Sequence, residues 1–195
     1  MSDVIADKTI DGKSSDRALH TLIFDDPECR PFYYKNGKSF KDYHKEGEIF
    51  WHKYVTYTEG MSDYWDYSFF NVSVIRYADV LLLYAECLND KGETTEAINI
   101  INKVRARVNV PALPLTMSKA EVLKHLQDKE RPCELALEGS RWYDLVRWGI
   151  VEETLKAHNK PFVENYVDTK HQLFPIPHSE FLLNPDWEQN PNYSK

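Results

Sequence analysis

Two amphipathic patterns separated by one glycine constrain this fold more than any other feature of the sequence. From residue 74 to 88 apolar side chains recur at 4-3-4-3 spacing, and from 97 to 108 they recur at 4-3-4 spacing. Such spacing places them on one stripe of a helix. Gly92 breaks the pattern, and Thr94 or Thr95 is a suitable N-cap. The pattern predicts an antiparallel hairpin of helices over 73–90 and 94–109.

This hairpin resembles a tetratricopeptide-type repeat in length and shape. A single hairpin cannot bury both of its faces, so neighbours must stack on it. We therefore expect a mainly α fold of tetratricopeptide-like helical hairpins with loop-rich irregular segments.

Further helices are predicted downstream. Ser118 and Glu121 form a capping box that opens a third helix. Pro132 falls inside this pattern, and a helix continuing to Glu138 would be kinked there. After Gly139, residues 142–148 predict a short fourth helix, and residues 151–156 suggest a fifth.

The chain divides into two regions by composition. Residues 1–70 read as a loop-rich, aromatic segment, since 14 of the 26 aromatic residues fall in 32–70. Asn36-Gly37 marks a turn, and short strands are expected around 40–57. Residues 71–195 form the helical region, whose proline-containing tail is apolar enough to pack rather than stay disordered.

Charge and cysteine content exclude several classes of protein. A net charge of −7 without clustered basic residues argues against a nucleic-acid partner. Cys29, Cys87 and Cys133 are odd in number and lack CxxC spacing, which argues against a disulfide framework or zinc ribbon. We expect Cys87 and Cys133 to be buried free thiols.

Four blocks follow one another along the helical region: Val74–Asn89, Ala97–Arg107, Glu130–Gly149 and Pro175–Tyr193. Together they resemble the SusD/RagB family over residues 71–195. Each block alone is a weak signal, and their order makes the resemblance specific. Two substitutions depart from the family pattern: Pro132 replaces a basic residue, and Asn192, which tolerates a left-handed backbone, replaces glycine.

The resemblance implies a largely helical fold around an irregular ligand-binding part. It also implies a non-enzymatic lipoprotein on the outer face of the outer membrane, which binds glycans and passes them to a SusC-like TonB-dependent transporter. Family members are much longer, so the chain looks like their C-terminal part. It would then be a fragment, a truncated relative or an engineered piece, without the family's N-terminal lipid anchor and early repeats. Residues 1–13 are polar and lack a signal-peptide pattern.

A set of charged residues superficially resembles an active site. Glu134 and Glu138 are four apart, which would place them on one helix face, and glycosidases use paired carboxylates. However, two pairs have the i,i+3 spacing of helix-surface ion pairs, Glu138 with Arg141 and Asp144 with Arg147. A neighbouring arginine lowers a carboxyl pKa, the wrong direction for a general acid. We therefore expect structural ion pairs and no catalysis. The set comprises Arg76, Glu86, Glu134, Glu138, Arg141, Asp144 and Arg147.

No metal or cofactor is expected. The histidines form no HExxH or comparable pair, and the sequence contains no glycine-rich phosphate loop and no GxSxG elbow.

The aromatic stretch at 50–70 is the candidate glycan site. Sugars combine apolar CH faces with hydroxyl edges, which suit flat rings beside polar groups. The alternative is that these rings fill the core. The candidates are Trp51, Tyr64, Trp65 and Tyr67 for stacking, with Asp63 and Asp66 to accept sugar hydroxyls.

The rival interpretation is a tetratricopeptide-type scaffold that binds peptides. Such a scaffold should show successive repeats, whereas one clear hairpin is visible here and most aromatic residues lie outside it.

Overall fold

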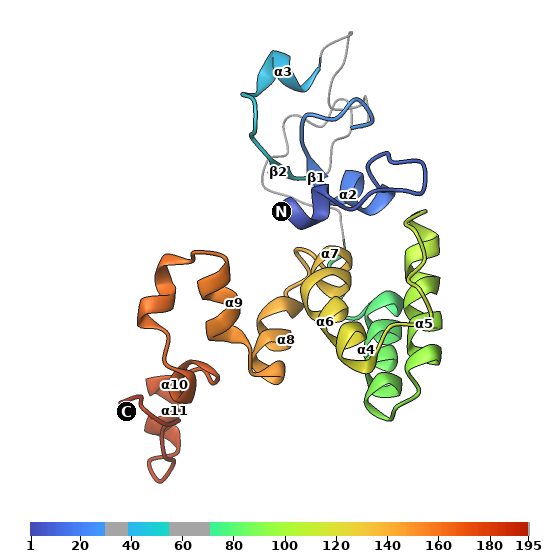
Figure 1. Ribbon diagram of the computed structural model, residues 1–195. Helices are drawn as coiled ribbons and strands as arrows, with labels where there is room; N and C mark the ends of the chain where they lie inside the picture. Colours follow the sequence, from blue (N-terminus) through green and yellow to red (C-terminus); the bar gives the residue numbers. More distant parts are fainter. Residues whose placement is uncertain (30–38, 55–70, 195) are drawn as a thin grey trace. The chain divides into compact units, whose positions relative to one another are not determined.

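The computed structural model describes residues 1–29, 39–54 and 71–194. Its secondary structure is almost entirely helical, which confirms the mainly α prediction (Figure 1). The chain forms two compact units, Met1–Arg141 and Trp142–Lys195. The boundary at residue 70 that composition suggested falls in a range outside the described residues.

The predicted hairpin is present as α4 (Tyr77–Asp90) and α5 (Thr94–Arg107), which pack along each other. Its core contains the predicted stripes, including Ala85, Leu88 and Ile101. Gly92 makes the connection in a left-handed conformation with φ of 89°, which a residue with a Cβ adopts at a cost.

Helix α4 starts later than predicted, whereas α5 starts at Thr94 as predicted. Val74 precedes α4 and is 92% exposed. The extended backbone of Arg76 delays the start of the helix, because the Arg76 guanidinium turns toward the carboxylates of Glu134 and Glu138, which are distant in sequence. In α5 the capping position is Glu93, and Thr94 already lies within the helix.

Among the described residues, no element covers one apolar face of α4, which is therefore exposed. Tyr77, Val80 and Tyr84 lie on it. Cys87 is also exposed, so the prediction of a buried thiol there was wrong. The apolar pattern in α4 runs around much of the helix, so spacing alone did not distinguish its two faces.

The third helical region accommodates Pro132 by widening. Ser118 and Glu121 form the predicted capping box of α6 (Lys119–His125). A π-helical segment, η3 (Leu126–Glu130), then leads into α7 (Arg131–Glu134). The Arg131 N–H donates to the carbonyl of Leu126, five residues earlier. This wider turn immediately precedes the proline, which cannot donate a backbone hydrogen bond and crowds the preceding turn.

The N-terminal part of this unit folds around a two-stranded antiparallel ribbon, β1 (Leu22–Ile23) and β2 (Phe50–Trp51). The helices α1 (Ser2–Ile5), α2 (Asp16–Thr21) and α3 (Phe40–Tyr43) accompany it. Thus 40–57 contains the expected strand at Phe50–Trp51, but also a helical turn.

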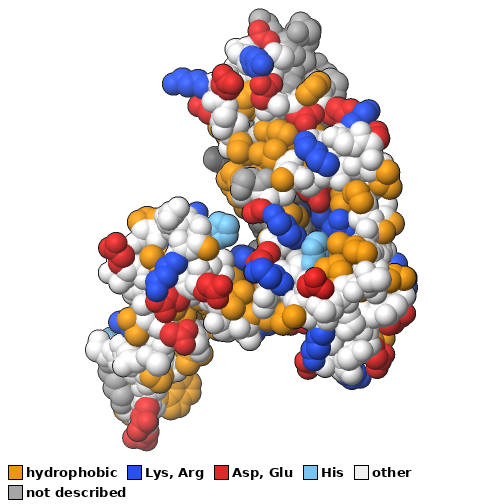
Figure 2. All heavy atoms as spheres, in the orientation of Figure 1, with side chains coloured by type: hydrophobic (Ala, Val, Ile, Leu, Met, Phe, Trp, Pro, Cys, Tyr) orange, Lys and Arg blue, Asp and Glu red, His pale blue; other side chains and the backbone are white. Residues whose placement is uncertain are grey.

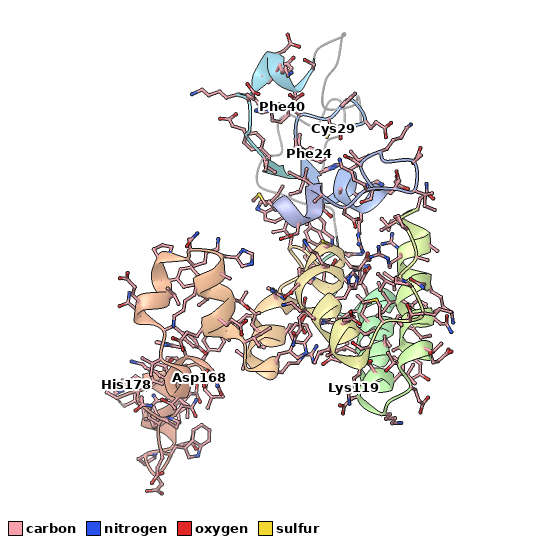
Figure 3. All side chains as sticks on the ribbon, viewed as in Figure 1. Phe24, Cys29, Phe40, Lys119, Asp168 and His178 are labelled. Carbon is pink, nitrogen blue, oxygen red and sulfur yellow. The ribbon has the colours of Figure 1, made fainter. Side chains whose placement is uncertain are left out.

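A second core in this unit contains Phe24 and Cys29, labelled in Figure 3, together with Leu22 and Cys133. Burial is the largest cause that raises the pKa of the Cys133 thiol, to about 12, so this thiol is inert and packs as an apolar group.

The boundary between the two units falls within α8 (Ser140–Trp148), which belongs to the second unit from Trp142 onward. The next helix of this unit is α9 (Val151–Ala157). The 3-10 helix η4 (Pro161–Asn165), α10 (Asp168–His171) and α11 (His178–Leu183) follow. Leu145, Val151 and Leu155 form its core.

Trp142 and Trp148, near the two ends of α8, are half-buried. Trp142 packs on the edge of the core of the second unit. The Trp148 ring lies 4.4 Å from the guanidinium carbon of Arg147.

Side-chain amides tie the proline-containing tail into a fixed path. Gln189 accepts a hydrogen bond from the Ile176 N–H and donates one to the Ile176 carbonyl, at 2.8 and 2.9 Å. Asn190 donates to the carbonyl of Phe174 at 2.7 Å. Asn192 takes the left-handed conformation, with φ of 66°. These contacts explain how an irregular tail stays packed, as predicted.

Replacement of Leu82 by Ala should lower the free energy of unfolding by about 2–5 kcal/mol, because this fully buried side chain fills the hairpin core. The matched control is Leu83→Ala on the same helix. That side chain is 39% exposed, and its loss should cost less than about 1 kcal/mol. Urea denaturation measures both, and equal losses would contradict the assignment of the two faces.

Candidate functional site

Three of the charged residues that suggested an active site, Arg76, Glu134 and Glu138, belong to a larger ion cluster in the first unit. Its members come from six separate parts of the chain. We call the following residues the ion cluster: Asp7, Arg17, Lys53, Arg76, Arg105, Arg107, His125, Glu130, Glu134 and Glu138.

Glu130 lies at its centre, and its side chain is fully buried. Arg17 of α2 donates to Oε1 at 2.7 Å, and Arg105 of α5 donates to Oε2 at 2.6 Å. The His125 Nε2 atom lies 2.9 Å from Oε2. Arg17 also forms a two-point contact with Asp7, at 2.7 and 2.8 Å. Each oxygen of Glu130 therefore has a cationic donor, as a buried carboxylate requires.

A second layer surrounds Glu134 and Glu138. Arg107 donates to both oxygens of Glu134, at 2.8 and 2.9 Å. Arg76 bridges the two carboxylates, with 3.2 Å to Glu134 and 2.6 Å to Glu138. Lys53 forms an ion pair with Glu138. Arg76, which directly precedes α4, is thus joined to Glu134 at the end of α7.

The expectation that Glu134 and Glu138 share a helix face was wrong. Helix α7 ends at Glu134, and Leu137 takes a left-handed conformation with φ of 65° before Glu138. The pairing of Glu138 comes from Arg76 and Lys53, which are remote in sequence. In the second unit, Asp144 and Arg147 form the predicted i,i+3 pair at 3.0 Å.

The pKa values of Glu130 and Glu138 are lowered, which argues against a role for either carboxyl as a general acid. Burial alone would raise the pKa of Glu130, but the hydrogen bond with His125 and the charges of Arg17 and Arg105 outweigh it and hold the pKa at about 2. Burial likewise acts to raise the pKa of Glu138, and the hydrogen bonds from Arg76 and Lys53 lower it overall. A general acid at neutral pH needs a raised pKa, so both carboxylates stay ionised and serve structure.

Within residues 1–29, 39–54 and 71–194, no group of three His, Cys, Asp or Glu side chains is arranged to hold a metal ion. The same residues include no helix long and apolar enough to cross a membrane. On the face drawn in Figure 2, Lys and Arg side chains are interspersed with Asp and Glu side chains, without a continuous basic surface.

Of the candidate glycan residues, the structure describes Trp51. Its side chain is 38% exposed at the end of β2, beside Phe50, which is 40% exposed. Trp51 pairs with Leu22 of β1, so its backbone is fixed by the ribbon. The other candidates, Asp63, Tyr64, Trp65, Asp66 and Tyr67, lie outside the described residues.

The second unit contains an aromatic hollow that sequence reasoning missed. It has a volume of about 320 Å³. Two of its rings are exposed, Phe162 at 53% and Phe174 at 72%. These rings are far apart in sequence and show no periodicity, so only the folded tail reveals them together. The aromatic hollow is lined by Trp142, Phe162, Tyr166, His171, Phe174 and Tyr193, with Leu155, Asn165 and Leu173.

Replacement of Glu130 by Gln should lower the free energy of unfolding by about 3–5 kcal/mol, because Arg17 and Arg105 would lose the charge that compensates their burial. The control is Asp128→Asn in the same π-helical segment. Asp128 forms an exposed i,i+4 pair with Lys124, whose loss should cost no more than about 1 kcal/mol. Similar losses in the two variants would contradict a central role for Glu130.

The wild-type protein and Glu130→Gln also allow a test of how stability depends on pH. The pKa of Glu130 falls from 4.5 to about 2 on folding, so between these values the unfolded state binds the proton more tightly. The stabilisation is present above pH 4.5 and is lost as the pH falls toward 2, and it amounts to about 3 kcal/mol. The stability difference between wild type and Glu130→Gln should shrink across this window in urea titrations. A difference that is independent of pH would refute the assignment.

Comparisons with known proteins agree with the geometry. The model of the SusD family matches residues 31–193. Two SusD-like proteins of Formosa agariphila, P38 and P2, are 37% and 31% identical over 130 and 131 residues. Each match covers 63% of this chain, but only 25% and 26% of the relatives. The chain thus spans about a quarter of the length of the curated relatives it matches.

A solved structure of a SusD superfamily protein from Bacteroides vulgatus matches 99% of this chain and 43% of its own chain. The TM-score is 0.78 at 28% sequence identity. A SusD homologue from Bacteroides thetaiotaomicron, at 35% identity, matches 61% of this chain with a TM-score of 0.51. The family match covers most of the sequence, and the structural match extends over nearly all of it. The chain therefore belongs to the SusD/RagB family.

Proposed function

We propose that this chain takes part in non-enzymatic glycan capture at the cell surface, on the outer face of the outer membrane. The captured glycan would pass to a SusC-like TonB-dependent transporter. Membership of the SusD family over residues 31–193 carries the proposal. The chemistry of the described residues supports it, because buried carboxylates are neutralised by arginines while aromatic rings reach the surface.

The aromatic stretch at 50–70 is the proposed glycan-binding segment. Trp51 supports this placement, since its exposed indole offers a flat apolar face and an N–H donor. Tyr64, Trp65 and Tyr67 would add stacking faces. Asp63 and Asp66 would accept sugar hydroxyls. A flat ring for the CH face beside acceptors for the hydroxyls is the combination that a sugar needs.

The exposed apolar face of α4 favours a second candidate, a peptide-binding scaffold. In this alternative, Tyr77, Val80 and Tyr84 would contact an amphipathic peptide. A tetratricopeptide groove that binds peptides is built from successive repeats. The described residues contain one hairpin of this type, α4–α5. Glycan capture is therefore preferred, and peptide binding without glycan binding would reverse the order.

Titration with a glycan panel tests the proposed segment. Wild-type protein should show saturable changes in tryptophan fluorescence or NMR shifts for at least one glycan. The variants Trp51→Ala and Trp65→Ala should weaken that binding by about three- to tenfold each, the loss expected for one aromatic contact. The control is Trp187→Ala, an indole that is 48% exposed in the other unit, which should bind as wild type. Unchanged affinity in both test variants, with the fold intact, would exclude residues 50–70 as the site.

No oligosaccharide should be hydrolysed, because the cationic partners of Glu130 and Glu138 lower the pKa values of these carboxyls, the wrong direction for a general acid. Incubation with the same panel should release no reducing ends above the buffer rate, and Glu138→Gln should give the same result. Turnover by wild type that disappears in Glu138→Gln would contradict the proposal and make Glu138 catalytic.

The transporter partner is tested separately. Its gene should lie next to the gene for this chain, and the two proteins should co-purify from outer membranes. Isolation of the full-length product without any TonB-dependent transporter would argue against this part of the proposal.

A further inference from the structure

The aromatic hollow of the second unit has the construction of a small-molecule site. Trp142 and Tyr166 meet edge to face at 6.2 Å, and Tyr166 lies 5.7 Å from the His171 ring at an interplanar angle of 33°. Leu155 closes the floor and is buried. Rings that brace one another in this way keep their orientation before a ligand arrives, which lowers the entropic cost of binding.

Local hydrogen bonds fix the polar groups of this hollow. The His171 Nδ1 atom accepts the Val167 N–H at 2.8 Å. The neutral ring therefore carries its proton on Nε2, which becomes a donor. The Tyr193 hydroxyl donates to the Leu173 carbonyl at 3.1 Å, and its oxygen retains acceptor capacity. Asn165 supplies both a donor and an acceptor on the wall.

Tyr166 is also positioned by its own hydroxyl. It donates to the Asp168 carboxylate at 2.8 Å, and Figure 3 labels Asp168 on α10. Burial, followed by this hydrogen bond and the charge of Asp168, raises the pKa of Tyr166 to about 12. The ring thus remains a neutral, oriented face at physiological pH.

These features match the chemistry of one or two sugar rings. The volume of about 320 Å³ is at the lower end of ligand pockets, which span roughly 300–1,000 Å³. Flat rings provide surfaces for the CH face of a pyranose, and His171, Asn165 and Tyr193 provide donors and acceptors for its hydroxyls. The exposed ring of Phe174 at the rim, 72% exposed, gives a further stacking face at the entrance.

We propose that the aromatic hollow is a second carbohydrate-binding site, which takes a terminal mono- or disaccharide unit. All of its lining residues belong to Trp142–Lys195, and none belongs to the 50–70 segment. This inference rests on the proposed glycan-capture function and extends it to a second place of contact with the same class of ligand.

The test is an NMR titration of the isotope-labelled chain with methyl α-glucoside, methyl β-galactoside, maltose and cellobiose. At least one sugar should shift the Trp142 indole N–H and the His171 ring signals in a saturable way. Phe174→Ala should weaken this binding by about three- to tenfold. Leu182→Ala is the matched control, since Leu182 is 73% exposed in the same unit and does not line the hollow, and it should leave the affinity unchanged.

The same titration separates the two proposals. Shifts at 50–70 with no shift at Trp142 or His171 would overturn the second site and leave the proposed function standing. Shifts at the hollow that persist in Trp51→Ala and Trp65→Ala would support an independent site. If none of the sugars moves any signal, the second site is refuted for this ligand class. An equal loss of affinity in Phe174→Ala and Leu182→Ala would also refute it.

Discussion

The buried carboxylate of Glu130 is the constraint on which the first unit depends. Burial of a single ionised carboxylate costs several kcal/mol, and this cost is offset only when well-placed cations share the site. Here the cations come from α2 and α5, while Glu130 itself lies in η3. None of these elements can satisfy the charge alone. The ion cluster therefore fixes where the N-terminal segment docks on the helical hairpin, in addition to the apolar contacts around Leu22 and Cys133.

This structural role accounts for the charged residues that gather around Glu130. A glycosidase needs two carboxylates in unequal environments, one of them with a raised pKa. Glu130 and Glu138 instead have lowered pKa values beside their cationic partners, and Glu134 pairs with Arg76 and Arg107. Contacts with a ligand are then expected from the aromatic surfaces. The ribbon that presents Trp51 and the aromatic hollow around Tyr166 both place rings on a fixed backbone.

Patterns that are local in sequence were predictable. Helical spacing identified α4 and α5, and the Ser118 capping box identified the start of α6, because both depend on neighbours within one or two turns. Features set by distant partners were not. The start of α4 depends on the contacts of Arg76 with Glu134 and Glu138. The structural role of Glu130 depends on its ion pair with Arg17, which lies 113 residues earlier in the sequence. The aromatic hollow also escaped prediction, because Trp142, Phe162 and Tyr193 meet through an irregular tail with no repeat in the sequence.

The central claim is that the ion cluster joins the N-terminal segment and the hairpin into one cooperative unit. Native-state hydrogen exchange tests this claim most directly. The hydrogen-bonded amides of α2, such as Leu19, which donates to Ser15, would be compared with core amides of α5. The account predicts opening free energies that agree within about 1 kcal/mol, because α2 cannot leave without exposing Glu130 unpaired. Exchange of α2 through a separate opening several kcal/mol below that of α5 would contradict the account.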